Sequence, residues 1–197
     1  QTCALPISFL DSRFLAGDTA VAREFELELY PAFIRKNRER FLQALVDIKR
    51  QRHEGFGQTI FQLEPDLKDA PGGLRDAHWA DWARKVLGAP GGADARIPAE
   101  VLAFHHLLRN FLHFESGRNH NVLSYEYQER IAVRLGYRDS EHGEAAENLM
   151  RDYFLNAGEI YRRASVWEEA IAGRPNQFSV QSDFSDPFEM LETFAEA

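Results

Sequence analysis

The stretch that decides the fold is Gln62-Leu-Glu-Pro-Asp-Leu-Lys-Asp-Ala-Pro-Gly-Gly-Leu-Arg-Asp76. Its Pro-Gly-Gly run, residues 71–73, is typical of a turn, because proline fixes one backbone angle and glycine tolerates conformations closed to other residues. An apolar series at helical spacing begins after it, at Leu74. We therefore expect a loop that leads into a helix, and this helix should end at Gly88.

The same stretch has the features of a small anion site. A turn that delivers the chain into a helix leaves the first backbone N–H groups bare, and these groups and the helix dipole favour an anion. Lys68 precedes the turn and Arg75 follows it, so two cations could converge on one phosphate. On the residues alone, the plainer interpretation is a glycine turn with a solvated lysine, in which Asp76 merely offsets the dipole.

Helical periodicity accounts for most of the rest of the chain. Asp18 is expected to cap a first helix, and Pro31 to open a second that ends near His53. A later helix follows Pro98, and Gly117 ends it. The expected helices span about 18–30, 31–53, 74–87, 99–116, 125–135 and 143–172.

Each expected helix carries an apolar stripe, which predicts one buried face. The stripes include Val21, Phe25, Leu29, Phe33, Ile34, Phe41, Leu45, Ile48, Trp79, Trp82, Val86, Val101, Leu108, Leu112, Ile131, Leu149, Tyr153, Ile160 and Trp167. Residues 59–63 alternate weakly and are candidates for a short extended segment. The predicted fold class is all-α, a bundle-like array of helices with at most one short extended segment.

Composition excludes several classes of protein. Hydrophobic residues make up 44% of the 197 residues and charged residues 27%, as in ordinary globular proteins. No run approaches the roughly 18 apolar residues that a membrane span needs. The net charge of −8 argues against nucleic-acid binding by phosphate neutralisation, although it leaves room for a local basic pocket.

The first residues differ in character from the remainder. Cys3 is the only cysteine, so the chain can form no internal disulfide and no cysteine metal cluster, which suits a reducing cytoplasm. Residues 1–7 resemble the translation of a sequencing adapter and are expected to be foreign. A secretory signal is the alternative, but the segment has neither a basic start nor an apolar core of the usual length.

The side chains that could hold a metal ion are not spaced to do so. His106, His113 and His120 are seven residues apart, which on a helix is a rise of roughly 10.5 Å, too far for two ligands of one ion. The glutamates at 24, 26 and 28 alternate around a helix by roughly 200° and cannot clamp one ion together. No Asp-x-Asp and no His-Asp pair occurs in the sequence, and the closest spacing is Asp139-Ser-Glu141. We therefore expect no metal site within this chain.

Residues 64–68, Glu-Pro-Asp-Leu-Lys, and 71–76, Pro-Gly-Gly-Leu-Arg-Asp, resemble the hallmark of the bacterial PII uridylyltransferase/uridylyl-removing enzymes, the GlnD family. Further blocks resemble that family in the same order, in residues 10–18, 108–113, 117–118, 127–132, 135–137 and 150–154. The glutamine synthetase adenylyltransferases share a Gly-Gly-x-Arg-(Asp/Glu) motif. They usually continue it with Ile-Glu-Phe, where this chain has Ala77-His78-Trp79.

The resemblance implies a parent enzyme that transfers UMP from UTP to a tyrosine of the PII nitrogen-regulatory protein and removes it when glutamine is plentiful. Its Mg²⁺ would be held by carboxylates of a Gly-Ser…Asp-x-Asp arrangement that precedes residue 8. We therefore expect no catalytic residue in this chain and no activity from it alone. The residues assigned to nucleotide phosphate binding are Lys68, Gly72, Gly73 and Arg75, and Glu64 and Asp76 complete the motif.

The implied organisation has four parts. Residues 1–7 are the foreign segment, 8–57 the helices that follow the nucleotidyltransferase core, 58–175 a helical domain of the GlnD type, and 176–197 the start of a linker to a downstream domain. Two other functions stay open: a domain without a catalytic role that docks PII, and an enzyme like glutamine synthetase adenylyltransferase. The expected partners are PII, UTP and, through downstream domains, glutamine, with no nucleic acid and no membrane.

Overall fold

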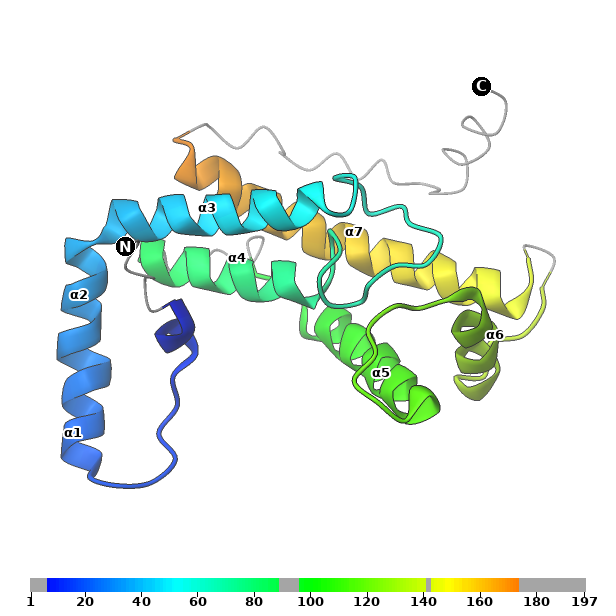
Figure 1. Cartoon of the computed structure of the whole chain (residues 1–197), viewed down its shortest axis with the longest axis horizontal. Coiled ribbons are helices and arrows are strands. Elements are labelled where there is room, and N and C mark those ends of the chain that lie inside the picture. The colour runs from blue at the N-terminus through cyan, green and yellow to red at the C-terminus, as the bar shows by residue number, and fades with distance from the viewer. Residues whose placement is uncertain (1–6, 89–95, 141–142, 174–197) are drawn as a thin grey trace.

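The computed structural model describes residues 7–88, 96–140 and 143–173, which form an array of helices (Figure 1). The elements are η1 (Ile7–Asp11), α1 (Thr19–Glu24), the π-helical turn η2 (Phe25–Leu29), α2 (Tyr30–Lys36), α3 (Arg38–Glu54), α4 (Leu74–Leu87), α5 (Ala99–Ser116), α6 (Tyr125–Arg134) and α7 (Ala145–Ile171). Within these ranges no residue belongs to a strand, so the predicted all-α class is confirmed. The expected adapter segment, apart from Ile7, and the expected linker lie outside the described residues.

The short extended segment predicted at residues 59–63 is not formed. In the described ranges, β pairing is limited to two isolated bridges, one between Asp66 and Val122 and one between Ser140 and Gly143. The first of these lies just beyond the predicted segment. Pro65 directly precedes it, and a proline cannot donate to a ladder of hydrogen bonds.

Helix α7 is the longest element and organises the others (Figure 1). α3 and α4 lie side by side and α4 packs along α7, while α5 and α6 pack on the N-terminal half of α7. One apolar cluster, centred on Phe41, Leu45 and Trp79, lies among α3, α4 and the C-terminal half of α7. A second, which includes Leu108 and Tyr153, lies among α5, α6 and the other half. We call α3 to α7 with their connections, residues 38–173, the body.

Several helix ends lie where the sequence places them. Asp18 caps α1, since its Oδ1 accepts a hydrogen bond of 2.8 Å from the N–H of Ala20. Gly88 and Gly117 end α4 and α5 with left-handed backbone angles, at φ of 63° in each case. These signals are local, which is why they are readable from the sequence.

The prediction that Pro31 separates two helices is wrong. α1, η2 and α2 follow one another without interruption, and the chain turns instead at Asn37, where φ is −113° and ψ is 18°. The π-helical turn directly before Pro31 accounts for this difference. It bonds the N–H of Tyr30 to the carbonyl of Phe25, five residues earlier, and widens the helix beside the proline ring, which has no N–H to donate.

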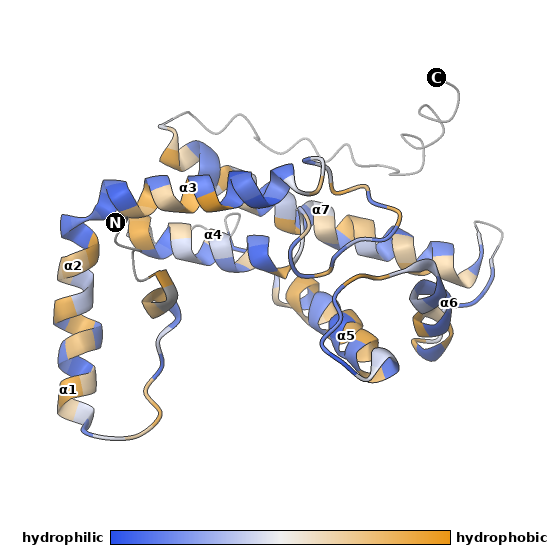
Figure 2. Ribbon diagram, in the orientation of Figure 1, coloured by the Kyte–Doolittle hydropathy of each residue, from blue (hydrophilic) through white to orange (hydrophobic). Residues whose placement is uncertain are grey.

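Residues 19–36, which comprise α1, η2 and α2, form a projection that we call the arm (Figure 1). α1 and η2 bury no residue, and α2 buries only Tyr30. The predicted burial is therefore wrong for Val21, Leu29 and Phe33 of the arm and for Ile48 of α3, which are exposed, whereas Phe41 and Leu45 of α3 are fully buried as expected. Figure 2 shows apolar residues along the whole arm, with no other element beside α1. No described helix is long and apolar enough to cross a membrane.

Candidate functional site

The Pro-Gly-Gly turn lies directly against α7. Gly72 has a left-handed φ of 76°, and a Cβ atom added to it would lie 2.5 Å from the carbonyl oxygen of Ala157. A Cβ atom on Gly73 would lie 2.9 Å from the carbonyl oxygens of Lys68 and Ala70. Both distances are far below van der Waals contact, so glycine at 72 lets the loop approach α7 this closely, and glycine at 73 lets the loop fold back on itself.

The loop before the turn is shaped by Asp66. Its Oδ1 accepts hydrogen bonds from the N–H groups of Lys68, at 2.8 Å, and Asp69, at 2.7 Å. This side chain thereby imitates a backbone turn, as aspartate commonly does in loops. Leu67, the next residue, is fully buried in the second cluster. The Glu-Pro-Asp-Leu-Lys half of the motif therefore anchors the loop to the core.

Asp76, in the first turn of α4, is the centre of a buried polar cluster. Its Oδ1 lies 2.6 Å from Nη2 of Arg52 and 2.9 Å from Nε2 of His53, both on α3. Its Oδ2 accepts a hydrogen bond of 2.8 Å from the N–H of Gly72. The carboxylate is fully buried, and each oxygen already accepts a hydrogen bond. We call Arg52, His53, Gly72 and Asp76 the junction, because it joins α3, the turn and α4.

The electrostatics of the junction favour an ionised Asp76. Burial by itself raises the pKa of a carboxyl group, because it penalises the charged form. The hydrogen bond and charge of His53, with the charges of Arg52 and Lys49, outweigh that penalty and lower the pKa of Asp76 below its usual value. The junction is therefore a charged tie within the fold rather than a neutral one.

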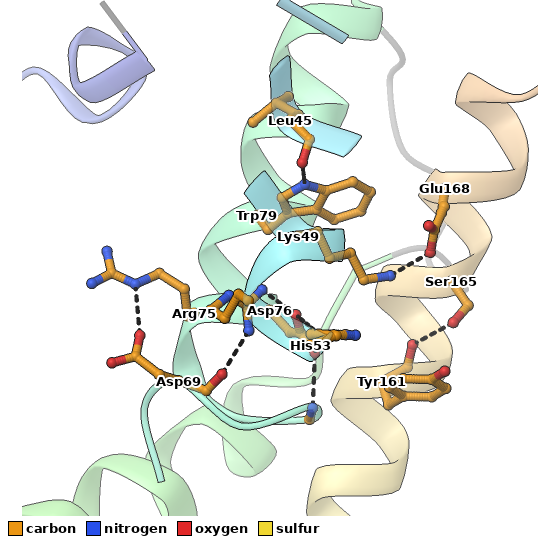
Figure 3. A network of polar contacts seen from close by, with 12 residues as sticks. Leu45, Lys49, His53, Asp69, Arg75, Asp76, Trp79, Tyr161, Ser165 and Glu168 are labelled. Carbon is orange, nitrogen blue, oxygen red and sulfur yellow. Dashed lines mark hydrogen bonds and ion pairs between the residues drawn. The ribbon is translucent and has the colours of Figure 1, made fainter. Parts of the chain in front are cut away.

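A second buried cation, Lys49, extends the junction along α3 (Figure 3). Only 3% of its side chain is exposed, and its Nζ lies 2.5 Å from Oε2 of Glu168 on α7. The same ammonium group lies 4.8 Å from the ring centroid of Trp79, a favourable distance for a cation over an aromatic face. The indole N–H of Trp79 donates to the carbonyl of Leu45 at 2.7 Å. Polar contacts thus connect α3 with both α4 and α7.

The N–H groups at the start of α4 are not bare, which corrects the premise of the anion site. The N–H of Leu74 donates to the carbonyl of Leu67 at 3.1 Å, and that of Arg75 to Lys68 at 2.8 Å. The N–H of Gly73 donates to Ala70 at 2.9 Å, and that of Gly72 to Asp76. The loop folds back over the helix end, so these N–H groups are occupied by carbonyls of the loop and, at Gly72, by the carboxylate of Asp76.

The side chains of Lys68 and Arg75, unlike these backbone N–H groups, are not held by buried hydrogen bonds among the described residues. Nε of Arg75 lies 3.2 Å from Oδ1 of Asp69, in a pair of which more than a third of each side chain is exposed (Figure 3). The ammonium group of Lys68 makes no hydrogen bond or ion pair with the described residues. The role of Lys68, Gly72, Gly73 and Arg75 in phosphate binding stays a prediction. Its possible donors are now the side chains of Lys68 and Arg75.

Glu64 has a structural contact that the sequence does not suggest. Its Oε1 accepts a hydrogen bond of 3.0 Å from the N–H of Tyr125, the first residue of α6. The cap residue of α6, Ser124, makes no capping bond with its own side chain. Glu64 therefore satisfies a helix end that lies 61 residues away. Nearby, the N–H of Leu67 donates to the carbonyl of Asn121 at 2.8 Å, so the motif also holds the connection between α5 and α6.

The described residues do not fit a magnesium site. Among them, no group of three or more histidine, cysteine, aspartate or glutamate side chains is placed to hold a metal ion. Asp139 uses its Oδ1 to accept a hydrogen bond of 3.0 Å from the N–H of Ala145, at the start of α7. Glu24, Glu26 and Glu28 are exposed on the arm. We derive no step of a reaction through a metal bound by these residues.

The chain matches proteins of known family. A family model described as GlnD PII-uridylyltransferase matches residues 40–96 and 91–165. Three relatives are each named bifunctional uridylyltransferase/uridylyl-removing enzyme. That of Cereibacter sphaeroides is 31% identical over 179 residues, with 85% of this chain and 19% of the relative covered. That of Nitrobacter hamburgensis is 34% identical over 167 residues, with 77% and 18% covered. That of Burkholderia thailandensis is 31% identical over 178 residues, with 84% and 20% covered.

The chain spans about a fifth of the length of the curated relatives it matches. No solved structure matches it. The family model covers more than half of the chain and includes the whole junction. The chain therefore belongs to the GlnD PII-uridylyltransferase family.

Proposed function

We propose that this chain is a structural helical segment of a longer enzyme that transfers UMP from UTP to the PII protein and removes it again. The family and the names of the relatives support the activity of the whole enzyme. The observation that carries the role of this segment is the burial of Asp76 among Arg52, His53 and Gly72. A carboxylate whose two oxygens are already bonded inside the fold holds helices together and has no oxygen turned toward a substrate.

The chemistry of transfer belongs, in this proposal, to other parts of the enzyme. Phosphoryl transfer relies on positioning and on metal ions that neutralise developing charge. The described residues offer no cluster of carboxylates for such an ion, so we assign the magnesium and its ligands to a segment outside this chain. Glutamine sensing is likewise assigned elsewhere. A cytoplasmic location follows from the proposed substrates, UTP and PII.

Contact with the phosphates of UTP is a second proposed role, and it has an observation in its favour. The ammonium group of Lys68 lacks a described partner, and the guanidinium group of Arg75 has a partly exposed one in Asp69. Both cations can therefore turn to a phosphate without leaving a buried charge unpaired. The contact would come from these two side chains, since the N–H groups of Gly72 and Gly73 are bonded within the loop.

Substitutions in the longer enzyme separate the two roles. Asp76→Asn should lower the free energy of unfolding by about 3 kcal/mol, because it leaves Arg52 and His53 facing a neutral group, and should leave KM for UTP unchanged at temperatures where the enzyme stays folded. Lys68→Ala and Arg75→Ala should raise KM for UTP roughly tenfold with little effect on stability. Thermal unfolding and steady-state transfer of UMP to PII measure both quantities.

A matched control is Arg84→Ala, which removes a half-buried guanidinium group paired with Asp81 on the same helix. It should change neither stability nor KM appreciably. An Asp76→Asn enzyme of normal stability that no longer turns over would show a chemical role for Asp76 and end the structural proposal. Unchanged KM in both Lys68→Ala and Arg75→Ala would end the phosphate proposal alone.

A further inference from the structure

Two fully buried polar side chains of the body, His105 on α5 and Tyr153 on α7, each have an atom without a hydrogen-bond partner among the described residues. The two atoms are Nε2 of His105 and the phenol oxygen Oη of Tyr153. Nearly all buried polar atoms in folded proteins bond to protein or to ordered water, because an unpaired atom loses its hydration without replacement. These two atoms therefore need a partner that the neighbouring side chains do not supply.

The surroundings of His105 fix which of its ring nitrogens carries the hydrogen. Nδ1 lies 3.1 Å from the carbonyl oxygen of Val101, one turn earlier on α5. A carbonyl oxygen only accepts, so Nδ1 carries the hydrogen and donates it. Burial lowers the pKa of His105 to about 4, an effect that the bond to Val101 opposes and the charge of His106 assists. The ring is therefore neutral near pH 7, and its Nε2 is an acceptor without a donor.

Tyr153 supplies the complementary group, a hydroxyl that keeps its proton. Burial raises the pKa of this phenol, and the negative charges of Asp66 and Asp76 raise it further. The hydroxyl group can therefore donate a hydrogen bond throughout the neutral pH range. Its ring lies beside that of His105, with ring centroids 5.6 Å apart and planes inclined by 48°. A donor and an acceptor thus lie on neighbouring buried rings without bonding each other directly.

One small molecule that accepts from Oη and donates to Nε2 satisfies both atoms. The other rings packed on this pair, Phe104 against His105 and Phe154 against Tyr153, have no hydrogen-bonding atoms to offer. A metal ion needs more ligands, and the described ranges hold no group of three or more histidine, cysteine, aspartate or glutamate side chains placed to provide them. Water both donates and accepts, and buried waters in proteins typically bond to polar groups that are otherwise unpaired.

We propose that one buried water molecule binds between Oη of Tyr153 and Nε2 of His105 and links α7 to α5. The site lies close to the motif, because Leu67 shares an apolar cluster with Tyr153, and Ala157, one turn further along α7, lies against Gly72. The water thereby ties α5 to the part of α7 on which the Pro-Gly-Gly turn rests. This inference goes beyond the proposed function and does not depend on it, since every group involved belongs to the body.

Removal of the hydroxyl group alone tests the proposal in the 197-residue chain, with urea denaturation as the measurement. Tyr153→Phe keeps the ring and deletes Oη. With the water bound, this variant loses a hydrogen bond and leaves the water poorly held, so its urea midpoint should fall below that of wild type. An unpaired hydroxyl has the opposite effect, because its removal relieves a buried polar atom and raises the midpoint. Tyr125→Phe is the matched control, since Tyr125 is 54% exposed, and it should leave the midpoint unchanged.

A double variant tests whether His105 is the other partner of the water. His105→Phe removes the acceptor Nε2, so in that background Tyr153→Phe should no longer lower the midpoint. An equal fall of the midpoint in both backgrounds would overturn the proposal, because the hydroxyl would then act without His105. A raised midpoint in the single variant Tyr153→Phe would overturn it as well.

A high-resolution crystal structure of the wild-type chain tests the site directly and does not depend on the folding of any variant. The expected result is a water oxygen within roughly 3 Å of both Oη of Tyr153 and Nε2 of His105. A direct bond between these two atoms would overturn the proposal. So would a separate protein partner for each atom, because no water would then be needed to join α5 to α7.

Discussion

The arm and the body are both helical and both carry apolar residues at helical spacing, but their side chains meet different surroundings. In the body, α7 covers the apolar faces of α4, α5 and α6, and α3 packs on α4 beside it. In the arm, η1 and α3 reach only the base, at Phe25, Tyr30 and Phe33. The helical period of a sequence therefore reports that a helix has one apolar face. Whether that face is covered depends on elements far away in the chain, or outside it.

The largest expected effect on stability comes from a leucine of the body, and a leucine of the arm serves as its comparison. Leu45→Ala removes a fully buried side chain from the body and should lower the free energy of unfolding by about 2–5 kcal/mol, through lost burial and the cavity left behind. Leu27→Ala removes an exposed side chain of the arm and should change it by less than about 0.5 kcal/mol. Urea denaturation of the 197-residue chain, followed by circular dichroism, measures both. Similar losses in the two variants would show that the arm is packed as tightly as the body.

The same contrast explains how far the sequence predicts the fold. The start of α4 at Leu74 and its end at Gly88 are predictable because a Pro-Gly-Gly turn and a C-terminal glycine act within a few residues. The uninterrupted arm is not, because the π-helical turn beside Pro31 depends on how the whole segment relaxes around one ring. The exposure of Val21 is not predictable either, because an apolar stripe does not show whether another element covers it.

The sequence singles out the loop of residues 64–76, but it does not reveal the contacts that Asp76 makes in the structure. The motif of residues 64–76 indicates a loop of unusual importance, and the loop is where the structure concentrates buried polar contacts. The partners of Asp76, however, are Arg52 and His53, which lie 24 and 23 residues earlier on another helix. A first-turn aspartate is normally explained by the helix dipole, so nothing local signals these partners. The sequence offers one weak indication of these partners, namely that Arg52 and His53 are adjacent basic residues near the end of α3.

A smaller effect on stability is expected from substitutions of two glycines, Gly72 and Gly117, that share left-handed backbone angles but differ in their surroundings. Gly72→Ala in the body places a methyl group against the carbonyl of Ala157 and also strains a left-handed backbone, so it should cost about 3 kcal/mol. Gly117→Ala has the same left-handed strain, but no atom lies within 4 Å of the added Cβ, so it should cost about 1 kcal/mol. Urea midpoints of the two variants give the difference. A Gly117→Ala loss as large as that of Gly72→Ala would mean that strain, rather than contact with α7, makes Gly72 necessary.

The smallest expected effect is a dependence of stability on pH that arises from the junction. The pKa of Asp76 is lower in the folded chain than its ordinary value, because His53, Arg52 and Lys49 outweigh the penalty of burial. A group of this kind contributes its full stabilisation above the ordinary aspartate pKa of roughly 3.9 and loses it as the pH falls toward the lower folded value. In that interval the unfolded chain binds a proton that the folded chain does not, so wild-type stability should fall by about 1.4 kcal/mol per pH unit from this group.

Asp76→Asn isolates this contribution, because asparagine has no proton to gain. The difference in unfolding free energy between wild type and variant should shrink as the pH falls below about 4. Urea denaturation at several pH values measures it, with Asp69→Asn as the control at a partly exposed carboxylate of the same loop. A difference that stays constant down to the lowest pH at which the chain folds would mean that Asp76 is not ionised in the junction. The contacts of Asp76 between α3 and α4 would then be neutral hydrogen bonds. A buried ion pair would in that case no longer distinguish the body from the arm.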